Sequence, residues 1–257
     1  MSRSTGKTKP RKTTVVLAGV LALLVLFALA VFVIRPAYRH YYVTHKEYPV
    51  YGGVTQDLKD CNLYKDMQSG KSFCFLGDSV TSGYEINNIP WYQPLVPYIK
   101  GNISNISRGG WMVHHLIEQA DNIPAADVYV IAIGVNDVVF PWGKYAAQTP
   151  EEYVNRLDKL AGIIRVKSPD AKIYFITPWT FTGKFTQYEE RGEQFRAALS
   201  KWCSSSGFEC INPHPYISSV LKEKGENGYM LSGIHPDNPK GIGLYCYAVL
   251  KADHERL

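Results

Sequence analysis

The sequence contains Phe73-Cys-Phe-Leu-Gly-Asp-Ser79-Val-Thr-Ser-Gly83, a short apolar run that ends abruptly in small, turn-forming residues. This pattern predicts a buried strand that delivers Ser79 to the edge of a sheet, with Gly77 permitting a tight turn. A serine in that place acts as a nucleophile only if a base, an orienting group and an oxyanion site exist elsewhere in the fold. Taken alone, the Gly-Asp-Ser triplet is equally consistent with a strand-to-helix turn whose serine caps the helix.

Strand and helix patterns alternate from residue 71 to the carboxyl end of the chain. Strands are predicted at 72–76, 103–106, 127–133, 172–177 and 209–211. Helices are predicted at 111–122, 150–167, 188–204, 216–224 and 240–251. Strands separated by helices imply an α/β fold with a mostly parallel sheet covered on both faces, and such sheets bind ligands at the carboxyl ends of their strands.

The charge distribution argues against a nucleic-acid surface. The 257-residue chain has a formal net charge of +5, and five basic residues with no acid among them lie in its first twelve positions. Without that cluster the remainder is close to neutral, so no basic face for nucleic acid is predicted.

Residues 15–34 are apolar or small throughout and carry no charge. Twenty helical residues span roughly 30 Å, the thickness of the hydrocarbon core of a bilayer. The sequence therefore predicts a basic cytoplasmic tail at 1–13, a single transmembrane helix at 14–35 that contacts the membrane, and a location outside the cytoplasm for the rest. The alternative is a signal peptide cleaved near Ala28-Leu29-Ala30, which would yield a secreted protein. Residues 36–70 are predicted to form a linker or an amino-terminal arm.

The five cysteines leave their pairing open. Cys74 lies in the predicted first strand and is expected to be a small buried apolar residue. Cys203 and Cys210 are close in sequence and could form a disulfide in an oxidising compartment, and Cys61 and Cys246 are further candidates. The sequence has no cysteine and histidine spacing typical of zinc ligands, and neither a metal nor a cofactor is predicted.

Chemically versatile residues follow successive predicted strands. Ser79 follows the first strand, Gly110 the second and Asn136 the third. His235 lies near the carboxyl end, in Ser232-Gly-Ile-His235-Pro-Asp237. A serine, a histidine, backbone N–H donors and a side-chain amide at one edge are the components of acyl transfer through a covalent serine ester.

These four blocks resemble the SGNH hydrolase superfamily, also called GDSL esterases and lipases. They are GDS at Ser79, a glycine at Gly110, GxND at Asn136 and HP at His235, in the order that the family shows. The resemblance implies a flavodoxin-like three-layer α/β/α catalytic domain over 71–257. It also implies Ser79 as nucleophile, His235 as base, and an oxyanion hole made by the N–H groups of Ser79 and Gly110 with the Asn136 amide.

Ser232 departs from the family's pattern, in which the residue three before the histidine is usually an aspartate that holds the imidazole. Loss of the orienting carboxylate in a comparable triad costs about 10⁴ in rate. Our hypothesis is a dyad of Ser79 and His235, assisted by Ser232 or by a backbone carbonyl. Asp237 is the second candidate for orienting the imidazole, although Pro236 stiffens the chain between them.

Aromatic residues gather after the same strands, and Trp111, Trp142 and Trp179 are predicted to bind substrate. Flat aromatic faces suit sugar rings and acyl chains alike. A site outside the cytoplasm favours an acylated carbohydrate of the cell envelope, so the predicted function is a serine esterase that removes acetyl groups from it. The alternatives are an O-acetyltransferase onto such a carbohydrate, a lipase or thioesterase, and a non-catalytic glycan-binding domain. The sequence does not determine the oligomeric state.

Overall fold

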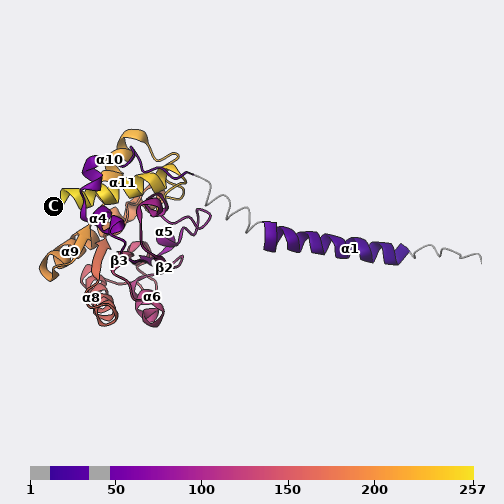
Figure 1. Ribbon diagram of the computed structural model, residues 1–257, viewed down its shortest axis with the longest axis horizontal. Coiled ribbons are helices and arrows are strands. Elements are labelled where there is room, and N and C mark those ends of the chain that lie inside the picture. Colours follow the sequence, from indigo (N-terminus) through magenta and orange to yellow (C-terminus); the bar gives the residue numbers. More distant parts are fainter. Residues whose placement is uncertain (1–11, 35–46) are drawn as a thin grey trace, which may run out of the picture. The chain divides into compact units, whose positions relative to one another are not determined.

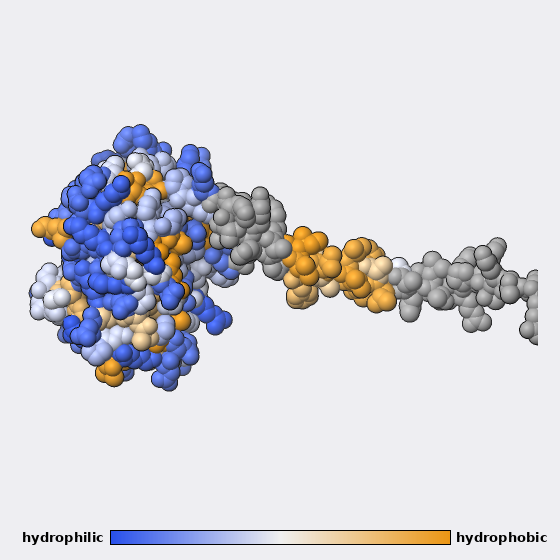
Figure 2. Space-filling model, viewed as in Figure 1, coloured by the Kyte–Doolittle hydropathy of each residue, from blue (hydrophilic) through white to orange (hydrophobic). Residues whose placement is uncertain are grey.

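The computed structural model describes residues 12–34 and 47–257 of the chain, which belong to two separate units divided after Lys46. In the first unit an α-helix, α1 (Lys12–Leu29), is followed by a π-helical turn, η1 (Ala30–Ile34). The side chains of residues 19–34 are mostly hydrophobic (Figure 2). Within the two described ranges, no helix is both long enough and apolar enough to cross a membrane.

The transmembrane helix predicted over 14–35 is therefore not supported. The α-helical hydrogen-bond ladder ends at Leu29, and the last residues of the predicted span adopt the wider π-helical turn instead. The tail at 1–11 and the stretch at 35–46 lie outside the described residues, so the predictions made for them stay predictions.

The second unit, Glu47–Leu257, is built on one five-stranded sheet (Figure 1). Its strands are β1 (Phe73–Gly77), β2 (Ile103–Ser107), β3 (Val128–Ala132), β4 (Lys172–Ile176) and β5 (Glu209–Ile211). They run parallel in the order β2-β1-β3-β4-β5. Every residue of β1 and β3 is buried, which explains why these two strands are apolar without alternation. The predicted parallel sheet is confirmed.

Helices cover both faces of the sheet (Figure 1). One face carries α4 (Asn62–Gln68), α10 (His214–Lys224) and α11 (Lys240–Glu255), with the short α3 (Gln56–Lys59) packed against α11. The other face carries α6 (Val113–Glu118), α8 (Pro150–Lys167) and α9 (Glu189–Ser206). The arrangement has the three α/β/α layers that the sequence predicts.

Several short helical elements were not predicted. They are α3, α4, α7 (Val135–Val139) and the 3₁₀-helices η2 (Gln93–Tyr98) and η4 (Gly183–Tyr188). The short helix α5 (Ser79–Ser82) follows the predicted turn, and the 3₁₀-helix η3 (Ala120–Asn122) lies within a predicted helix. The helix predicted at 111–122 divides into α6 and η3. Elements of one or two turns are too short to show a helical period in the sequence.

The compact unit begins at Glu47, earlier than residue 71, where the sequence analysis places the start of the catalytic domain. The side chains of Leu58, Leu63 and Met67 are fully buried in the core. The backbone N–H of Leu63 donates to Oδ2 of Asp253 on α11, with a distance of 2.6 Å. The described part of the predicted arm is thus packed into the domain.

All five cysteines are free thiols, so the bridge considered for Cys203 and Cys210 is not formed. Cys74 is buried in β1, as expected.

Candidate active site

Ser79 lies where β1 ends and the short helix α5 begins. Asp78 is the N-cap of that helix, and its Oδ1 accepts a hydrogen bond from the N–H of Val80 at 3.0 Å. A Cβ atom on Gly77 would lie 2.2 Å from Oγ1 of Thr81 and 2.5 Å from the carbonyl oxygen of Ala132. The close approach of these neighbours therefore requires glycine before the Asp-Ser pair. The turn predicted from the sequence holds Ser79 at the carboxyl end of a central strand.

The imidazole of His235 meets the Ser79 hydroxyl, with 2.7 Å between Nε2 and Oγ. His235 lies in the loop between α10 and α11, whose two sides are joined by an antiparallel bridge of Met230 and Pro236. The N–H of Leu231 donates to the carbonyl of His235 at 2.9 Å. This hairpin-like loop brings together two predicted site residues that are 156 positions apart in the sequence.

The proton of a neutral imidazole lies on one of its two nitrogens. When Nε2 accepts the serine proton, a neutral imidazole carries its own proton on Nδ1. Burial lowers the pKa of His235 below its ordinary value, and the negative charge of Glu85 opposes that shift. The ring is therefore neutral at neutral pH, which is the state that a general base requires.

Two predicted oxyanion donors lie on the loops that follow the neighbouring strands. Gly110, after β2, has a φ of +80°, a left-handed conformation that favours glycine. Asn136, on α7 after β3, is buried, and its Nδ2 donates to the carbonyl of Trp111 at 2.8 Å. Because an amide nitrogen carries two protons, the second remains available to an oxyanion. This bond also ties Asn136 to the loop that contains Gly110.

Two buried aspartates stabilise these turns. Asp137 accepts from the N–H of Ala147 at 2.9 Å and from that of Val113 at 3.3 Å, so it holds the start of α6. Burial raises the pKa of Asp137 to about 6 and that of Asp78 to about 7. The negative charge of Asp137 adds to the shift at Asp78. Both carboxyl groups bond to the backbone rather than to His235.

The group that orients His235 differs from both sequence hypotheses taken alone. Oγ of Ser232 lies 2.7 Å from Nδ1 of the imidazole, as the dyad hypothesis requires. Glu85 is not among the predicted site residues. Its Oε2 lies 2.9 Å from the same Nδ1 and can only accept a hydrogen bond, since a carboxylate has no proton to donate. Asp237, the second candidate, has a different contact: its Oδ1 accepts from the N–H of Asn238 at 2.7 Å.

The three predicted substrate-binding tryptophans lie in different environments. Trp142 is 72 % exposed and its ring packs edge-on against Phe140. Trp111 is partly buried next to Gly110. Trp179 is only 1 % exposed and stacks on Tyr245 with 4.6 Å between ring centroids, so its predicted role in substrate binding is wrong.

The exposed Tyr84 adds to this aromatic surface. Tyr84 lies two residues beyond α5, and its ring is 3.0 Å from where a Cβ atom on Gly109 would be. Tyr84, Trp111 and Trp142 thus provide aromatic surface on the segments that follow β1, β2 and β3, and these segments also contain Ser79, Gly110 and Asn136.

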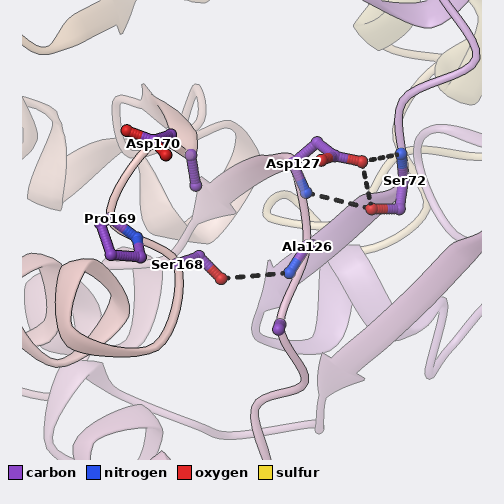
Figure 3. Close-up of a pocket in the computed structure, with 8 residues that line it drawn as sticks. Ser72, Ala126, Asp127, Ser168, Pro169 and Asp170 are labelled. Atoms are coloured by element: carbon purple, nitrogen blue, oxygen red, sulfur yellow. Dashed lines mark hydrogen bonds between the residues drawn. The ribbon is translucent and has the colours of Figure 1, made fainter.

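A hollow of about 330 Å³ lies at the opposite edge of the sheet, before the amino ends of β1, β3 and β4 (Figure 3). Oδ2 of Asp127 in this hollow accepts from both the N–H and the hydroxyl of Ser72, at 2.8 and 2.6 Å. Oγ of Ser168 accepts from the N–H of Ala126 at 3.3 Å. These bonds join loops, and the hollow is separate from the Ser79 site.

The predicted site residues lie within a segment that matches a known protein family. Residues 75–241, which contain Ser79, Gly110, Asn136 and His235, match the GDSL-like Lipase/Acylhydrolase family. No match to a protein with a curated description was found.

Solved structures with the same fold include a protein described as a GDSL-like lipase from Parabacteroides merdae. It has 21 % sequence identity and a TM-score of 0.61 over 73 % of this chain and 97 % of its own. A catalytic mutant of Axe2, an acetylxylan esterase from Geobacillus stearothermophilus, has 18 % identity and a TM-score of 0.62 over 73 % of this chain and 96 % of its own. LAE5, an α/β hydrolase from the metagenome of Lake Arreo in Spain, has 18 % identity and a TM-score of 0.59 over 72 % and 95 %.

Proposed function

Because the chain belongs to the GDSL-like lipase/acylhydrolase family and is an ester hydrolase, we propose that it cleaves esters through an acyl intermediate on Ser79. The observation that carries this proposal is the 2.7 Å hydrogen bond between Oγ of Ser79 and Nε2 of His235. A hydroxyl becomes an effective nucleophile when an adjacent base accepts its proton during attack.

The proposed reaction has two matching halves. Oγ of Ser79 attacks the ester carbonyl while its proton passes to Nε2 of His235, and the imidazolium then protonates the departing alcohol. The oxyanion of the tetrahedral intermediate is stabilised by the N–H groups of Ser79 and Gly110 and by the amide of Asn136. Each such donor contributes about 10²- to 10³-fold in rate in comparable enzymes. Water, deprotonated by His235, then releases the acid and restores the serine.

We propose acetylated carbohydrate as the substrate class. The exposed rings of Tyr84 and Trp142, together with Trp111, give flat faces on which a sugar ring can stack. A structure with the same fold is described as an acetylxylan esterase, which supports acetylated carbohydrate as the substrate to test first.

We further propose that the enzyme acts outside the cytoplasm, on carbohydrate of the cell envelope. The support is the uncharged apolar sequence at 15–34, which follows a cluster of basic residues as in segments that direct export. A fusion of alkaline phosphatase to the carboxyl end should be active in a bacterial host and inactive when 15–34 is deleted. An intact but inactive fusion of the full chain would place the enzyme in the cytoplasm.

The esterase proposal is tested with p-nitrophenyl esters of two to twelve acyl carbons and with acetylated xylan. We expect kcat/KM to be highest for acetate and acetate to be released from the polysaccharide. Ser79→Ala should lower kcat by about 10⁴-fold or more, as loss of a catalytic serine does elsewhere. Ser204→Ala, which removes an exposed hydroxyl from α9, is the matched control and should keep full activity.

Two results would contradict these proposals. A rate that rises steadily with acyl length would favour a lipase. Unchanged activity in Ser79→Ala would rule out the acyl-serine mechanism.

A further inference from the structure

We propose that Glu85 is the positioning residue for His235, and that the Ser232 hydroxyl links the two. Together they replace the aspartate that is missing three residues before the histidine. This inference rests on the esterase mechanism proposed above.

Three atoms form a small triangle at the back of the imidazole. Oε2 of Glu85 lies 2.9 Å from Nδ1 of His235 and 2.9 Å from Oγ of Ser232. Oγ of Ser232 in turn lies 2.7 Å from Nδ1. Each side of the triangle is therefore within hydrogen-bond distance.

The direction of each bond follows from which atoms can donate. Nδ1 of His235 carries the ring proton, because Oε2 of Glu85, 2.9 Å away, can only accept a hydrogen bond. Nε2 of the neutral ring is then the acceptor for the Ser79 hydroxyl. A carboxylate has no proton to give, so the Ser232 hydroxyl donates to Glu85 and keeps its lone pairs for the Nδ1–H. The carboxylate also accepts directly from Nδ1–H. The carboxylate of Glu85 thus holds the imidazole in the required tautomer and orientation in two ways, by a direct hydrogen bond and through the Ser232 hydroxyl.

The loop that carries Glu85 is fixed to the nucleophile's own helix. The N–H of Tyr84 donates to the carbonyl of Ser79 at 3.0 Å, and that of Ile86 donates to the carbonyl of Gly83 at 3.0 Å. Ile86, directly after Glu85, is buried in the domain. The backbone at Glu85 is therefore held close to Ser79, and the carboxylate is placed by its contacts with His235 and Ser232.

The charge of Glu85 also matches the charge that develops on the histidine. His235 becomes an imidazolium in both halves of the proposed reaction, and a carboxylate at Nδ1 stabilises it. Within the described residues, Glu85 is the one charged side chain that pairs with His235. Its side chain is 38 % exposed, so water screens the pair. We therefore expect a smaller effect than the loss of about 10⁴-fold that follows removal of a buried triad aspartate.

The test replaces the carboxylate with its neutral isostere. In Glu85→Gln we expect kcat for p-nitrophenyl acetate to fall about 100-fold, two orders of magnitude below the buried-aspartate case, with KM changed by less than about threefold. The acid limb of the kcat/KM profile should move to lower pH, because the charge that raises the imidazole pKa is gone. Glu226→Gln, the same change at an exposed loop position, should leave both the rate and the limb unchanged.

A second variant moves the charge to the position that the family uses. Ser232→Asp in the Glu85→Gln background should recover at least about tenfold of the lost rate, because a carboxylate again faces Nδ1. The melting temperature of each variant and the rate at which a fluorophosphonate labels Ser79 separate loss of folding from loss of positioning.

The outcomes distinguish this inference from the mechanism on which it rests. Activity retained in Ser79→Ala overturns the esterase mechanism. If Ser79→Ala is inactive while folded Glu85→Gln keeps at least half the wild-type rate and an unmoved acid limb, Glu85 has no positioning role. If Ser232→Asp restores no activity in the Glu85→Gln background, the fall in kcat of Glu85→Gln does not come from loss of the negative charge at Nδ1. That result also overturns the inference.

Discussion

Asp78 is a fully buried carboxyl group directly before Ser79. One of its oxygens caps α5, whereas Oδ2 has no hydrogen-bond partner among the described residues. Burial raises its pKa from an ordinary value of 3.8 to about 7, with a smaller contribution from the charge of Asp137. The protonated form is therefore favoured in the folded state relative to the unfolded chain.

Asp78→Asn should change how stability depends on pH. A folded-state pKa above the unfolded value contributes stability that is complete below about pH 4 and is lost as pH rises to about 7. Asparagine keeps the capping oxygen and does not ionise. We expect the variant and wild type to unfold alike near pH 4, and the variant to be more stable by about 2 to 4 kcal/mol at pH 8, measured by urea denaturation.

Asp127 provides the opposite case for comparison. Its pKa is lowered, chiefly by the hydrogen bond from the Ser72 hydroxyl, so its contribution is present at neutral pH and is lost as pH falls through the folded-state value. Asp127→Asn should therefore be less stable than wild type at neutral pH. The prediction for Asp78 is contradicted if the stability of Asp78→Asn depends on pH as that of wild type does. That result would mean that the pKa of Asp78 is the same in the folded and unfolded chain.

The predicted site residues are those that carry a local signal in the sequence. Ser79, Gly110, Asn136 and His235 each lie in a short block of sequence. In the structure Ser79 begins α5 and Asn136 lies on α7, whereas Gly110 and His235 lie on loops. Glu85 has no such signal, because its contact with Ser232 joins positions 147 apart, on two loops. The missing aspartate showed that a replacement was needed but not where it lay.

The error at Trp179 has a related cause. A tryptophan after a strand can point to solvent or to the core, and only the neighbouring elements decide. Here Tyr245 of α11 covers the ring.

The junction between β1 and α5 is the element on which the nucleophile depends. Gly77 pairs with Ser107 of β2 and Ala132 of β3, so it is enclosed on both sides. Gly77→Ala should destabilise the fold by about 3 kcal/mol, because its Cβ would overlap Thr81 and the carbonyl of Ala132. Thermal and urea denaturation measure the loss.

Gly162→Ala is the matched control. Gly162 lies within α8, where a Cβ atom would meet no other atom within 4 Å. Since alanine favours a helix over glycine by about 1 kcal/mol, this variant should be slightly more stable than wild type. Equal stability of the two variants would contradict the packing argument at Gly77.

Long elements with a clear period were predicted more accurately than short ones. The helix predicted at 150–167 is α8 without change, since Thr149 caps it by accepting from the N–H of Glu152 and Pro150 begins it. Over 111–122, hydrophobic spacing predicted one helix, but only Val113–Glu118 is α-helical. The N-terminus of α6 is set by the bond from Val113 to Asp137, a tertiary contact that the local pattern does not contain.

The domain as a whole includes residues 47–70, which close the face of the sheet that carries α11. Leu58, Leu63 and Met67 are buried there, and burial of each such side chain contributes about 1.5 to 3 kcal/mol. Asp253, also buried, accepts from the N–H of Leu63. Together these contributions are comparable with the whole stability of a typical domain, about 5 to 15 kcal/mol.

We therefore expect a chain of residues 47–257 to unfold cooperatively in urea, as followed by tryptophan fluorescence. A chain of residues 71–257 should show no cooperative transition, because α11 would expose its apolar face and Oδ2 of Asp253 would lose the N–H of Leu63. Equal midpoints for the two chains would mean that residues 47–70 are dispensable.

The short distance in sequence between Ser79 and Glu85 has a consequence for how the catalytic centre forms. Both ring nitrogens of His235 bond to one seven-residue segment, residues 79–85, from opposite sides. When the loop between α10 and α11 docks, the base gains its proton donor and its counter-charge in a single event. A molecule in which this loop has not folded onto residues 79–85 lacks both contacts. We therefore expect no appreciable population in which His235 bonds to only one of Ser79 and Glu85.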